Sequence, residues 1–594
     1  MYYIGIDLGT TNSVLAYAQS SDDDNRRAKV QLLPIPQLVD AATLESRGNL
    51  PSFLYLASEK SDKYALPWAA DRDFAVGYYA LRLSDSQPMR TVDKAKSWLC
   101  HNRVDRHEPI LPWQAPDDVQ KISPVEASRR ILEHLVNAWN DAFPNDPLVE
   151  QSVVLTVPAS FDAAARELTR EAALKAGLPE NFLLLEEPQA AVYAWLASRE
   201  ETWRKELTKD DTLLVCDVGG GTSDFSLIDV QENDGELSLN RLAVGNHLLV
   251  GGDNMDLAIA YLASQKFAEK GTKLDPWQNV ALQHLARAAK ERLLAADAPE
   301  THTIAIAGRG RSLIGGNVSV EMTRTEVVDL LLNGFFPECA VTDKPQKQRS
   351  SGFRQMGLPY ESDVAISRHL SAFLQNHLTD APGKFPTRIL FNGGVFKSGC
   401  LRDRLFDTLA QWSEGGRAVS PLDAEADLDN SVAEGAAYYA WAKHNGGIRI
   451  RGGTARAYYV GIETAGLAIP GMPRPLNALC VAPMGMEEGT EVEVPNGQMD
   501  IGLVVGEPEK FRIFSSSTRK QDQPGDWLKS WTEDQVQETD SLETTLDDEQ
   551  GIHSDGYVPV SFQSRVTELG MFELWCRSTN SDEKWKLEFS VREQ

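Results

Sequence analysis

Two Gly- and Thr-rich segments carry the residues of this chain that are best placed to do chemistry. Segment 7–12 (DLGTTN) follows the apolar run YYIGI, and segment 217–222 (DVGGGT) follows the apolar run TLLVC. Glycines at a hairpin tip leave backbone N–H groups free to bind an anion, and hydroxyl groups add donors. An Asp that ends each strand supplies the oxygen that Mg²⁺ prefers, usually through bound water. Together the segments predict a triphosphate site in which Asp7 and Asp217 hold hydrated magnesium.

A single hairpin of this kind has a plainer interpretation, because tight β-turns often need Gly for positive φ. The presence of two matched copies favours the phosphate site over two unrelated turns. No G-x-x-x-x-G-K-[ST] sequence occurs, so the site is not of the P-loop type. The ten histidines show no H-E-x-x-H spacing, which argues against a zinc protease site.

The elements that position these segments repeat along the chain. Strands are expected at 2–7 and 13–18 around the first segment, and at 212–217 and 224–230 around the second. This repetition predicts an internal duplication with two related half-domains. Helices are expected from Ser123, which fits an N-cap before Pro124, and over 162–176 with Gly177 as the C′ residue.

Further alternation of strands and helices indicates α/β architecture. Another long helix is expected over 277–296, and the strand 388–394 leads into a helix that begins near Gly399. After residue 444 the pattern changes to short alternating runs, which predict an all-β module joined through a Gly/Arg-rich linker. Within that module, the polar and acidic composition of 515–556 predicts a long mobile loop.

Composition excludes several classes of protein. The chain has 594 residues, of which 59 are basic and 86 acidic, and its formal net charge of −27 argues against a nucleic-acid or membrane surface as the main partner. The six scattered cysteines form no C-x-x-C pair and suit a reducing compartment. We expect no secretory signal and no transmembrane helix, and hence a cytoplasmic protein.

Six segments occur in an order that resembles the DnaK-type chaperones of the heat-shock protein 70 family. They are IGIDLGTTNS (4–13), VVLTVPASFDAAARELTREAALKAGL (153–178), LEEPQAA (185–191), CDVGGGTSDFSL (216–227), VGGDNMD (250–256) and NGGVFKSGCLRDRL (392–405). The resemblance covers about residues 1–442. It implies a duplicated actin-like (ribonuclease H-like) ATPase domain, with lobe I at about 1–200 and lobe II at about 201–444. A linker at 445–455 and a β-sandwich-like module at 456–594 would follow.

The same resemblance implies roles for matching residues. Asp7, Asp217 and Glu187 would order the water shell of Mg²⁺, and Asp224 with Asp7 would orient the attacking water. Lys96 resembles the lysine that positions this water, with Lys94 as its competitor and a solvated helix-face lysine as the plain alternative. The expected phosphate contacts are Gly9, Thr10, Thr11, Asn12, Gly219, Gly220, Gly221, Thr222, Gly251 and Gly252, with Asp253 in the same turn as the last two. Thr222 is also expected to act in catalysis.

At the adenosine end the resemblance is weaker. Gly393 and Gly394 match the adenosine motif, Asp429 matches the aspartate beside the adenine, and Lys290 matches the lysine near the ribose. The residues that usually accompany them are replaced by Val395, Lys397, Arg287 and Leu294. A plain Gly-Gly turn is the alternative for 393–394. These departures concern base selectivity and leave the phosphate chemistry untouched.

Further departures lie downstream. Pro158 and Arg166 resemble switch residues that report the nucleotide state, although a helix entry and a surface cation are the plain alternatives. The joint IRIRGGTARA is basic, whereas the family linker is acidic and leucine-rich. RAYYVGIET (456–464) resembles the first strand of the substrate-binding module, and we expect the helical lid to be missing. Trp527 and Trp531 are either core residues or a contact surface.

The preferred hypothesis is a slow, Mg-dependent ATPase that acts as a heat-shock protein 70-like chaperone in protein folding. ATP/ADP and Mg²⁺ would be its cofactors, and a client protein, J-domain proteins and nucleotide-exchange co-chaperones its partners. The alternative is a non-catalytic, nucleotide-sensing scaffold or exchange-factor-like protein for one dedicated partner. A sugar kinase and an actin-like filament protein share the fold but lack supporting motifs here.

Overall fold

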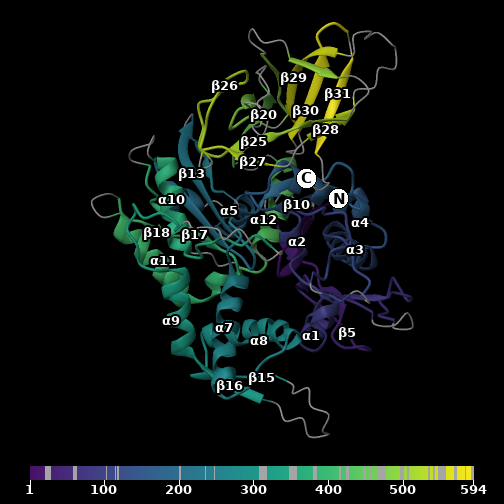
Figure 1. Cartoon of the computed structure of the whole chain (residues 1–594), viewed down its shortest axis with the longest axis vertical. Helices are drawn as coiled ribbons and strands as arrows, with labels where there is room; N and C mark the ends of the chain where they lie inside the picture. Colours follow the sequence, from purple (N-terminus) through teal and green to yellow (C-terminus); the bar gives the residue numbers. More distant parts are fainter. Residues whose placement is uncertain are drawn as a thin grey trace, which may run out of the picture.

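The chain forms two α/β lobes and a group of C-terminal β-sheets, as the computed structural model in Figure 1 shows. The structure describes all residues except 20–27, 58–62, 102, 114, 117–118, 200–201, 234–235, 247, 307–317, 347–357, 379–383, 414–416, 423–426, 446–449, 452, 455, 464–475, 488, 496–500, 505–507, 533–534, 540–541, 546–556, 568–571, 582 and 590–594. All six cysteines are free.

The first lobe is built on a six-stranded sheet with the order β11-β10-β1-β2-β3, in which β6 also pairs with β2. Its strands are β1 (Tyr2–Leu8), β2 (Asn12–Gln19), β3 (Val30–Leu32), β6 (Leu50–Pro51), β10 (Ser152–Val157) and β11 (Leu183–Glu186). β1 and β2 are antiparallel with Asp7 opposite Val14, so the predicted Gly/Thr hairpin is confirmed. β10 runs parallel to β1, and Asp7 therefore lies beside Thr156, near the carboxyl ends of the two strands.

The second lobe repeats this plan with the order β18-β17-β12-β13-β14-β19. Its strands are β12 (Thr212–Val218), β13 (Ser223–Asn233), β14 (Glu236–Val244), β17 (Arg388–Asn392), β18 (Ser420–Pro421) and β19 (Ile450–Arg451). The hairpin β12–β13 places Asp217 opposite Asp224, and β17 runs parallel to β12. An internal duplication predicts this repeated order, in which the two Gly/Thr turns occupy equivalent positions.

The helices follow the strands in α/β alternation. They are α1 (Tyr78–Ser86), α2 (Ala95–Trp98), α3 (Pro124–Ala142), α4 (Ala163–Ala176), α5 (Glu187–Arg199), α6 (Trp203–Glu206), α7 (Gly252–Glu269), α8 (Pro276–Leu294), α9 (Arg324–Phe335), α10 (Ile366–Leu378), α11 (Gly399–Trp412) and α12 (Ser431–Asn445). Smaller sheets contain β4 (Ile35–Leu38), β5 (Leu44–Arg47), β7 (Leu54–Leu56), β8 (Phe74–Val76), β9 (Thr91–Val92), β15 (Thr301–Ile306) and β16 (Val318–Thr323).

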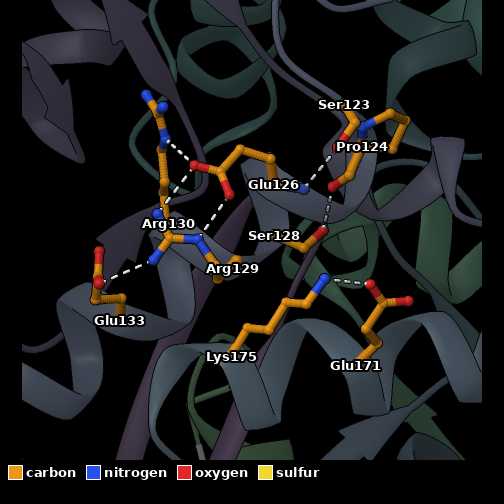
Figure 2. Close-up of polar contacts among 9 residues, drawn as sticks. All are labelled: Ser123, Pro124, Glu126, Ser128, Arg129, Arg130, Glu133, Glu171 and Lys175. Atoms are coloured by element: carbon orange, nitrogen blue, oxygen red, sulfur yellow. Dashed lines mark hydrogen bonds and ion pairs between the residues drawn. The ribbon is translucent and has the colours of Figure 1, made fainter. Parts of the chain in front are cut away.

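The N-terminus of α3 shows why the sequence starts a helix where predicted (Figure 2). The Ser123 hydroxyl accepts a hydrogen bond from the Glu126 N–H at 3.0 Å, and Pro124 occupies the first helical position. The Glu126 carboxylate also pairs with Arg129 and Arg130 at 2.6 Å each. The apolar face of α3 packs in the core of the first lobe. The predicted α4 is likewise confirmed, with Gly177 in the left-handed region at φ 99°.

Helices α5 and α12 cross in direct contact and join the lobes. A Cβ at Gly435 of α12 would collide with the Ala190 carbonyl oxygen of α5, so only glycine permits this approach. On its other side α12 lies against the first sheet, where a Cβ at Gly5 would collide with the Ala433 carbonyl oxygen. A core cluster shared by both helices contains Tyr193 and residues from both sheets.

All regular elements that the structure describes after Asn445 are strands. One sheet contains β20 (Ala457–Glu463), β21 (Leu476–Ala482), β25 (Ile513–Ser516), β26 (Trp527–Leu528) and β27 (Gln537–Glu538). The other contains β22 (Glu491–Val494), β23 (Ile501–Val504), β24 (Pro508–Phe511), β28 (Leu542–Thr545), β29 (Tyr557–Val566), β30 (Phe572–Ser578) and β31 (Lys584–Phe589). Residues of both sheets share one apolar cluster, which also contains Ala163 of α4.

The prediction of one long mobile loop over 515–556 is wrong for the part of it that the structure describes. β26, β27 and β28 lie within it, and Trp527 of β26 pairs with Leu479. These strands are short. β26 and β27 are edge strands, whereas β28 pairs with both β24 and β31, so a polar composition does not prevent pairing. Trp527 packs against the shared cluster of the two C-terminal sheets. Trp531 makes an edge contact with Phe514 at 5.3 Å, which supports core packing for both tryptophans.

The linker predicted at 445–455 also contributes a strand. Ile450–Arg451 forms β19 and pairs in parallel with Leu239 and Asn240 of β14, so the joint extends the sheet of the second lobe. Residues 446–449, 452 and 455 of the predicted linker lie outside the described part of the chain. The basic, Gly-rich joint is therefore compatible with docking on a lobe, although it lacks the leucine-rich composition expected of a docking linker.

Candidate functional site

A cavity of about 660 Å³ lies between the two lobes and collects most of the predicted site residues. Those that line it are Asp7, Gly9, Thr10, Thr11, Asn12, Lys96, Glu187, Asp217, Gly219, Gly220, Thr222, Gly252, Lys290, Gly393, Gly394 and Asp429. Asp224, Gly221 and Gly251 are not part of this lining. We call this space the nucleotide cavity.

The two Gly/Thr turns meet face to face at one end of the nucleotide cavity. A Cβ at Gly220 would collide with the Thr11 hydroxyl, and a Cβ at Gly221 would lie 2.7 Å from the Ser97 hydroxyl. The second turn closes through the Gly219 N–H, which donates to the Thr222 carbonyl at 2.9 Å. The contact between turns of both lobes requires the absence of side chains, which is why the sequence places glycines there.

The carboxyl groups of Asp7 and Asp217 end equivalent strands and have equivalent partners. Asp7 accepts a hydrogen bond from the Thr156 hydroxyl at 3.0 Å, and Asp217 accepts one from the Asn392 side-chain amide at 2.8 Å. Burial raises the pKa of Asp7 to about 6, although Lys96 lowers it. Burial, helped by the negative charge of Glu187, raises the pKa of Asp217 to about 8.

Asp224 is buried and lies opposite Asp217 in the hairpin β12–β13. Burial raises its pKa to about 6, while hydrogen bonding to Ser160 acts in the opposite direction. Several acidic groups close together in a buried site favour a bound cation, because each carboxylate raises the pKa of its neighbours.

The lysine that faces the acidic groups is Lys96. It is 7% exposed and forms an ion pair with Glu187, the first residue of α5. Burial opposes its charge, but Glu187 and Asp7 outweigh this effect and raise the pKa of Lys96. Lys94, the competitor in the sequence, points elsewhere and lies 3.8 Å from Asp253. The geometry therefore favours Lys96 as the cation of the nucleotide cavity.

The start of α7 and the middle of α8 form the next part of the wall. The Gly251 N–H donates to the Asn254 side chain at 2.9 Å and caps α7. Lys290 of α8 donates to the Gly252 carbonyl at 2.9 Å and pairs with Asp256 at 2.6 Å. These bonds tie α8 to the glycine turn and hold the Lys290 ammonium group at the cavity wall.

At the far end of the cavity, Gly393 adopts φ 87°, and a Cβ there would collide with the Val218 carbonyl oxygen. This turn needs glycine, whatever binds beside it. Lys397, which replaces the arginine expected from the resemblance, pairs with Asp429. The carboxylate expected beside the adenine therefore already has a cationic partner from the chain.

Two residues that the sequence analysis missed also line the cavity. The Arg47 guanidinium lies 3.8 Å from the ring centre of Tyr78, and both side chains face the cavity from the first lobe. No motif surrounds either residue. Their position depends on how β5 and α1 fold back toward the second lobe. The sequence offered at most one signal for this, an amphipathic segment after the first hairpin.

Arg166, the predicted switch residue, takes part in a buried ionic group of three. It pairs with Glu186 at 3.0 Å, and Arg241 of β14 pairs with the same carboxylate. Arg241 also donates to the Gly453 carbonyl in the joint. Glu186 immediately precedes Glu187 in the chain. Glu187 lines the nucleotide cavity, whereas Glu186 pairs with the arginine that contacts the joint. Pro158 begins the turn before α4, where its carbonyl accepts a bond from the Phe161 N–H.

Two other kinds of site are absent from the described residues. None of their helices is both long and apolar enough to cross a membrane. In the same part of the chain, no three His, Cys, Asp or Glu side chains are grouped so as to bind a metal directly. The donor set of Asp7, Glu187 and Asp217 still fits magnesium held through water, because Mg²⁺ prefers carboxylate oxygen and retains several waters.

Comparisons with known proteins point to one family. The model of the family described as Hsp70 protein matches residues 89–341. The Chaperone protein HscA homolog of Bordetella petrii is 31% identical over 312 residues, which cover 51% of this chain and 43% of the relative. The corresponding protein of Vibrio vulnificus is 32% identical over 300 residues, 48% of this chain and 41% of the relative.

The Chaperone protein DnaK of Stenotrophomonas maltophilia is 27% identical over 368 residues, which cover 59% of this chain and 52% of the relative. The matches therefore span about half, or less, of the length of these curated relatives. Lys96, Glu187, Asp217 and α8 lie within the region that the family model matches.

Proposed function

We propose that this chain is a member of the Hsp70 family, which its similar proteins indicate, and that it is an ATP-dependent molecular chaperone that hydrolyses ATP in the nucleotide cavity. The observation that carries this proposal is the convergence of Asp7, Lys96, Glu187 and Asp217 from two lobes on one cavity of about 660 Å³. Its volume lies in the range typical of small-molecule sites. The paired glycine turns supply backbone donors for phosphate oxygens at one end, and the Gly393 turn lets a base approach at the other.

In this proposal the chain positions water and phosphate rather than forming a covalent intermediate. Lys96 and Asp7 hold a water in line with the terminal phosphorus, and Asp224 fixes its orientation from behind. The water oxygen bonds to that phosphorus as the bond to the bridging oxygen breaks, and the electron pair of that bond stays on ADP. The proton of the water passes to a neighbouring carboxylate. Magnesium, held through water by Asp7, Glu187 and Asp217, would neutralise phosphate charge.

The remaining expectations of the sequence belong to the same proposal. Mg²⁺ dependence, a slow rate, J-domain and nucleotide-exchange partners, and cytoplasmic location stay predictions. The residue ranges 1–444, 445–455 and 456–594 are proposed as the nucleotide-binding domain, the linker and a client-binding β-module. Closure of the lobes on ATP would reach the β-module through the joint, because β19 extends the sheet of the second lobe.

Single-turnover hydrolysis of ATP tests the enzymatic part. We expect Asp217→Asn to slow cleavage by about 100-fold or more, the effect typical of removing one electrostatic contact to the reacting groups. Asp297→Asn is the matched control, because the Asp297 side chain is 84% exposed and lies outside the cavity. Equal rates in wild type and Asp217→Asn would contradict the proposal and favour the non-catalytic scaffold. Release of an unfolded apolar peptide on addition of ATP tests the chaperone part.

A further inference from the structure

A second cavity, of about 390 Å³, lies between the lobes beside the nucleotide cavity. Its walls come from the first lobe through Val92, Trp98 and Trp113 and from the second lobe through Val280, His284 and Tyr360. None of the predicted site residues except the competitor Lys94 lines it. The proposed function therefore leaves this space without a role. We call it the second cavity.

A narrow space of about 20 Å³ lies between the two cavities and shares its walls with both. Thr10, Thr11 and Asp253 line this neck and the nucleotide cavity, whereas Lys94 and His284 line the neck and the second cavity. This volume accommodates about one water molecule. The neck is thus the narrowest point of a series of spaces that runs between the lobes.

The neck opens at the phosphate end of the nucleotide cavity. The Asp253 N–H donates to the Gly220 carbonyl at 2.7 Å, and Gly220 faces Thr11 across the lobes. The turn at Gly393, which would lie beside the base, is at the other end. A phosphate produced by hydrolysis would therefore lie next to the neck, while ADP fills the cavity between that phosphate and the base end.

Lys94 is the cation positioned in the neck. It has a left-handed backbone conformation, φ 58°, and precedes α2, which carries Lys96. Its ammonium group lies 3.8 Å from the Asp253 carboxylate and 3.7 Å from that of Asp93. Both distances exceed those of a charge-assisted hydrogen bond. Burial opposes the charge of Lys94, but Asp253 and Asp93 outweigh this effect and raise its pKa, so the ammonium group is paired with both acids through their charge. Arg287 lines the neck as well, so two cationic side chains there face the carboxylates of Asp93, Asp253 and Asp256.

We propose that the neck and the second cavity are the outlet through which inorganic phosphate leaves after hydrolysis, and that Lys94 exchanges Asp253 for the departing anion. This inference rests on the proposed ATPase function. Because the outlet has walls from both lobes, a small separation of the lobes widens it while ADP remains bound. Phosphate release is thereby separated from nucleotide release.

Filling the second cavity tests the outlet without touching the nucleotide cavity. Val280→Trp should leave cleavage of bound ATP, measured by chemical quench in a single turnover, at the wild-type rate. It should slow the release of phosphate, measured with a fluorescent phosphate-binding protein, by about tenfold or more. Val149→Trp is the matched control, because Val149 is 55% exposed on the surface. Release as fast as in wild type would overturn the inference.

A second experiment follows an anion in the opposite direction and does not need hydrolysis. Beryllium fluoride occupies the terminal-phosphate position beside ADP, so its entry into the ADP-loaded protein reports on the same route. We expect both Lys94→Met and Val280→Trp to slow its entry by about tenfold. Lys209→Met, at a lysine that is 60% exposed, should not change it.

The two experiments distinguish the possible failures. If the wild type does not cleave ATP but the two substitutions still slow entry of beryllium fluoride, the proposed function fails, and the neck and second cavity stand as an anion route without a hydrolysis product to carry. If cleavage occurs and neither substitution changes release or entry, the outlet fails and the proposed function stands. Failure of beryllium fluoride to enter the ADP-loaded wild type by any route also overturns the outlet.

Discussion

At the scale of single residues, the Asp217 carboxyl group has the surroundings least suited to a negative charge. Burial and the nearby Glu187 raise its pKa to about 8, so it is largely protonated at neutral pH in the protein without ligands. In the unfolded chain its pKa returns to the ordinary value of an aspartate side chain, 3.8. The folded state therefore binds the proton more tightly, and Asp217 stabilises it most at low pH.

We expect the stability contributed by this proton to be lost as the pH rises from about 4 through about 8. In Asp217→Asn, the side chain stays neutral and keeps contact with Asn392. Its thermal midpoint, measured without nucleotide at pH 5 to 9, should therefore fall less as the pH rises than that of wild type. The two falls should differ by a few degrees, at ~2–4 °C per kcal/mol of stability. Parallel pH profiles of wild type and variant would contradict the raised pKa of Asp217.

The same residues show how far a sequence predicts a site. Asp7 and Asp217 were identified because each ends an apolar strand before a glycine turn, a local pattern that the backbone geometry requires. Arg47 and Tyr78 were missed because no local pattern requires them, and their place in the cavity depends on packing between distant segments. The choice between Lys94 and Lys96 also needed the structure, because both are near the start of the same short helix.

At the scale of elements, the repeated strands, the capped α3 and the turn after α4 were all predictable from local spacing. The position of α12 was not predictable in this way. This helix follows the second lobe in the sequence, yet it contacts α5 and lies on the sheet of the first lobe. Its sequence contains a signal, since Gly435 interrupts a helix rich in alanine. Without the fold, that glycine is indistinguishable from a tolerated weak point in the helix.

The crossing of α5 and α12 gives a matched pair of predictions about stability. Gly435→Ala places a Cβ against the Ala190 carbonyl oxygen and should lower the free energy of unfolding by about 1–3 kcal/mol. Gly334→Ala in α9 meets no atom within 4 Å and should raise it by up to about 1 kcal/mol, because alanine favours the helix. Urea denaturation measures both. Equal effects of the two substitutions would show that the crossing tolerates a side chain.

At the scale of the whole molecule, one buried ionic group connects both lobes with the joint. Glu186 of the first lobe is 7% exposed and pairs with Arg166 and with Arg241 of the second lobe. Arg241 also holds the Gly453 carbonyl. Because Glu186 and Glu187 are neighbours in the chain, we expect a movement of Glu187 toward bound nucleotide to displace the carboxylate that holds Arg241. Adjacent residues of the chain thus contact the nucleotide cavity and, through Arg241, the joint.

This arrangement predicts that nucleotide changes the exposure of the joint. Trypsin cleaves after arginine, and the joint contains Arg449, Arg451 and Arg456. We expect the rate of cleavage there, followed by gel electrophoresis and mass spectrometry, to differ between the ATP and ADP states by about threefold or more, the ratio given by a coupling of ~0.7 kcal/mol or more. Arg241→Met should speed cleavage in both states and remove the difference, because the Gly453 carbonyl loses its donor.

Arg402→Met is the control for this last experiment, since Arg402 is 51% exposed on α11 and contacts neither Glu186 nor the joint. It should preserve the difference between the ATP and ADP states. If Arg241→Met behaves like this control, the ionic group does not couple the cavity to the joint. If wild type shows no difference between the two states, the lobes act without the joint, as the non-catalytic scaffold would require.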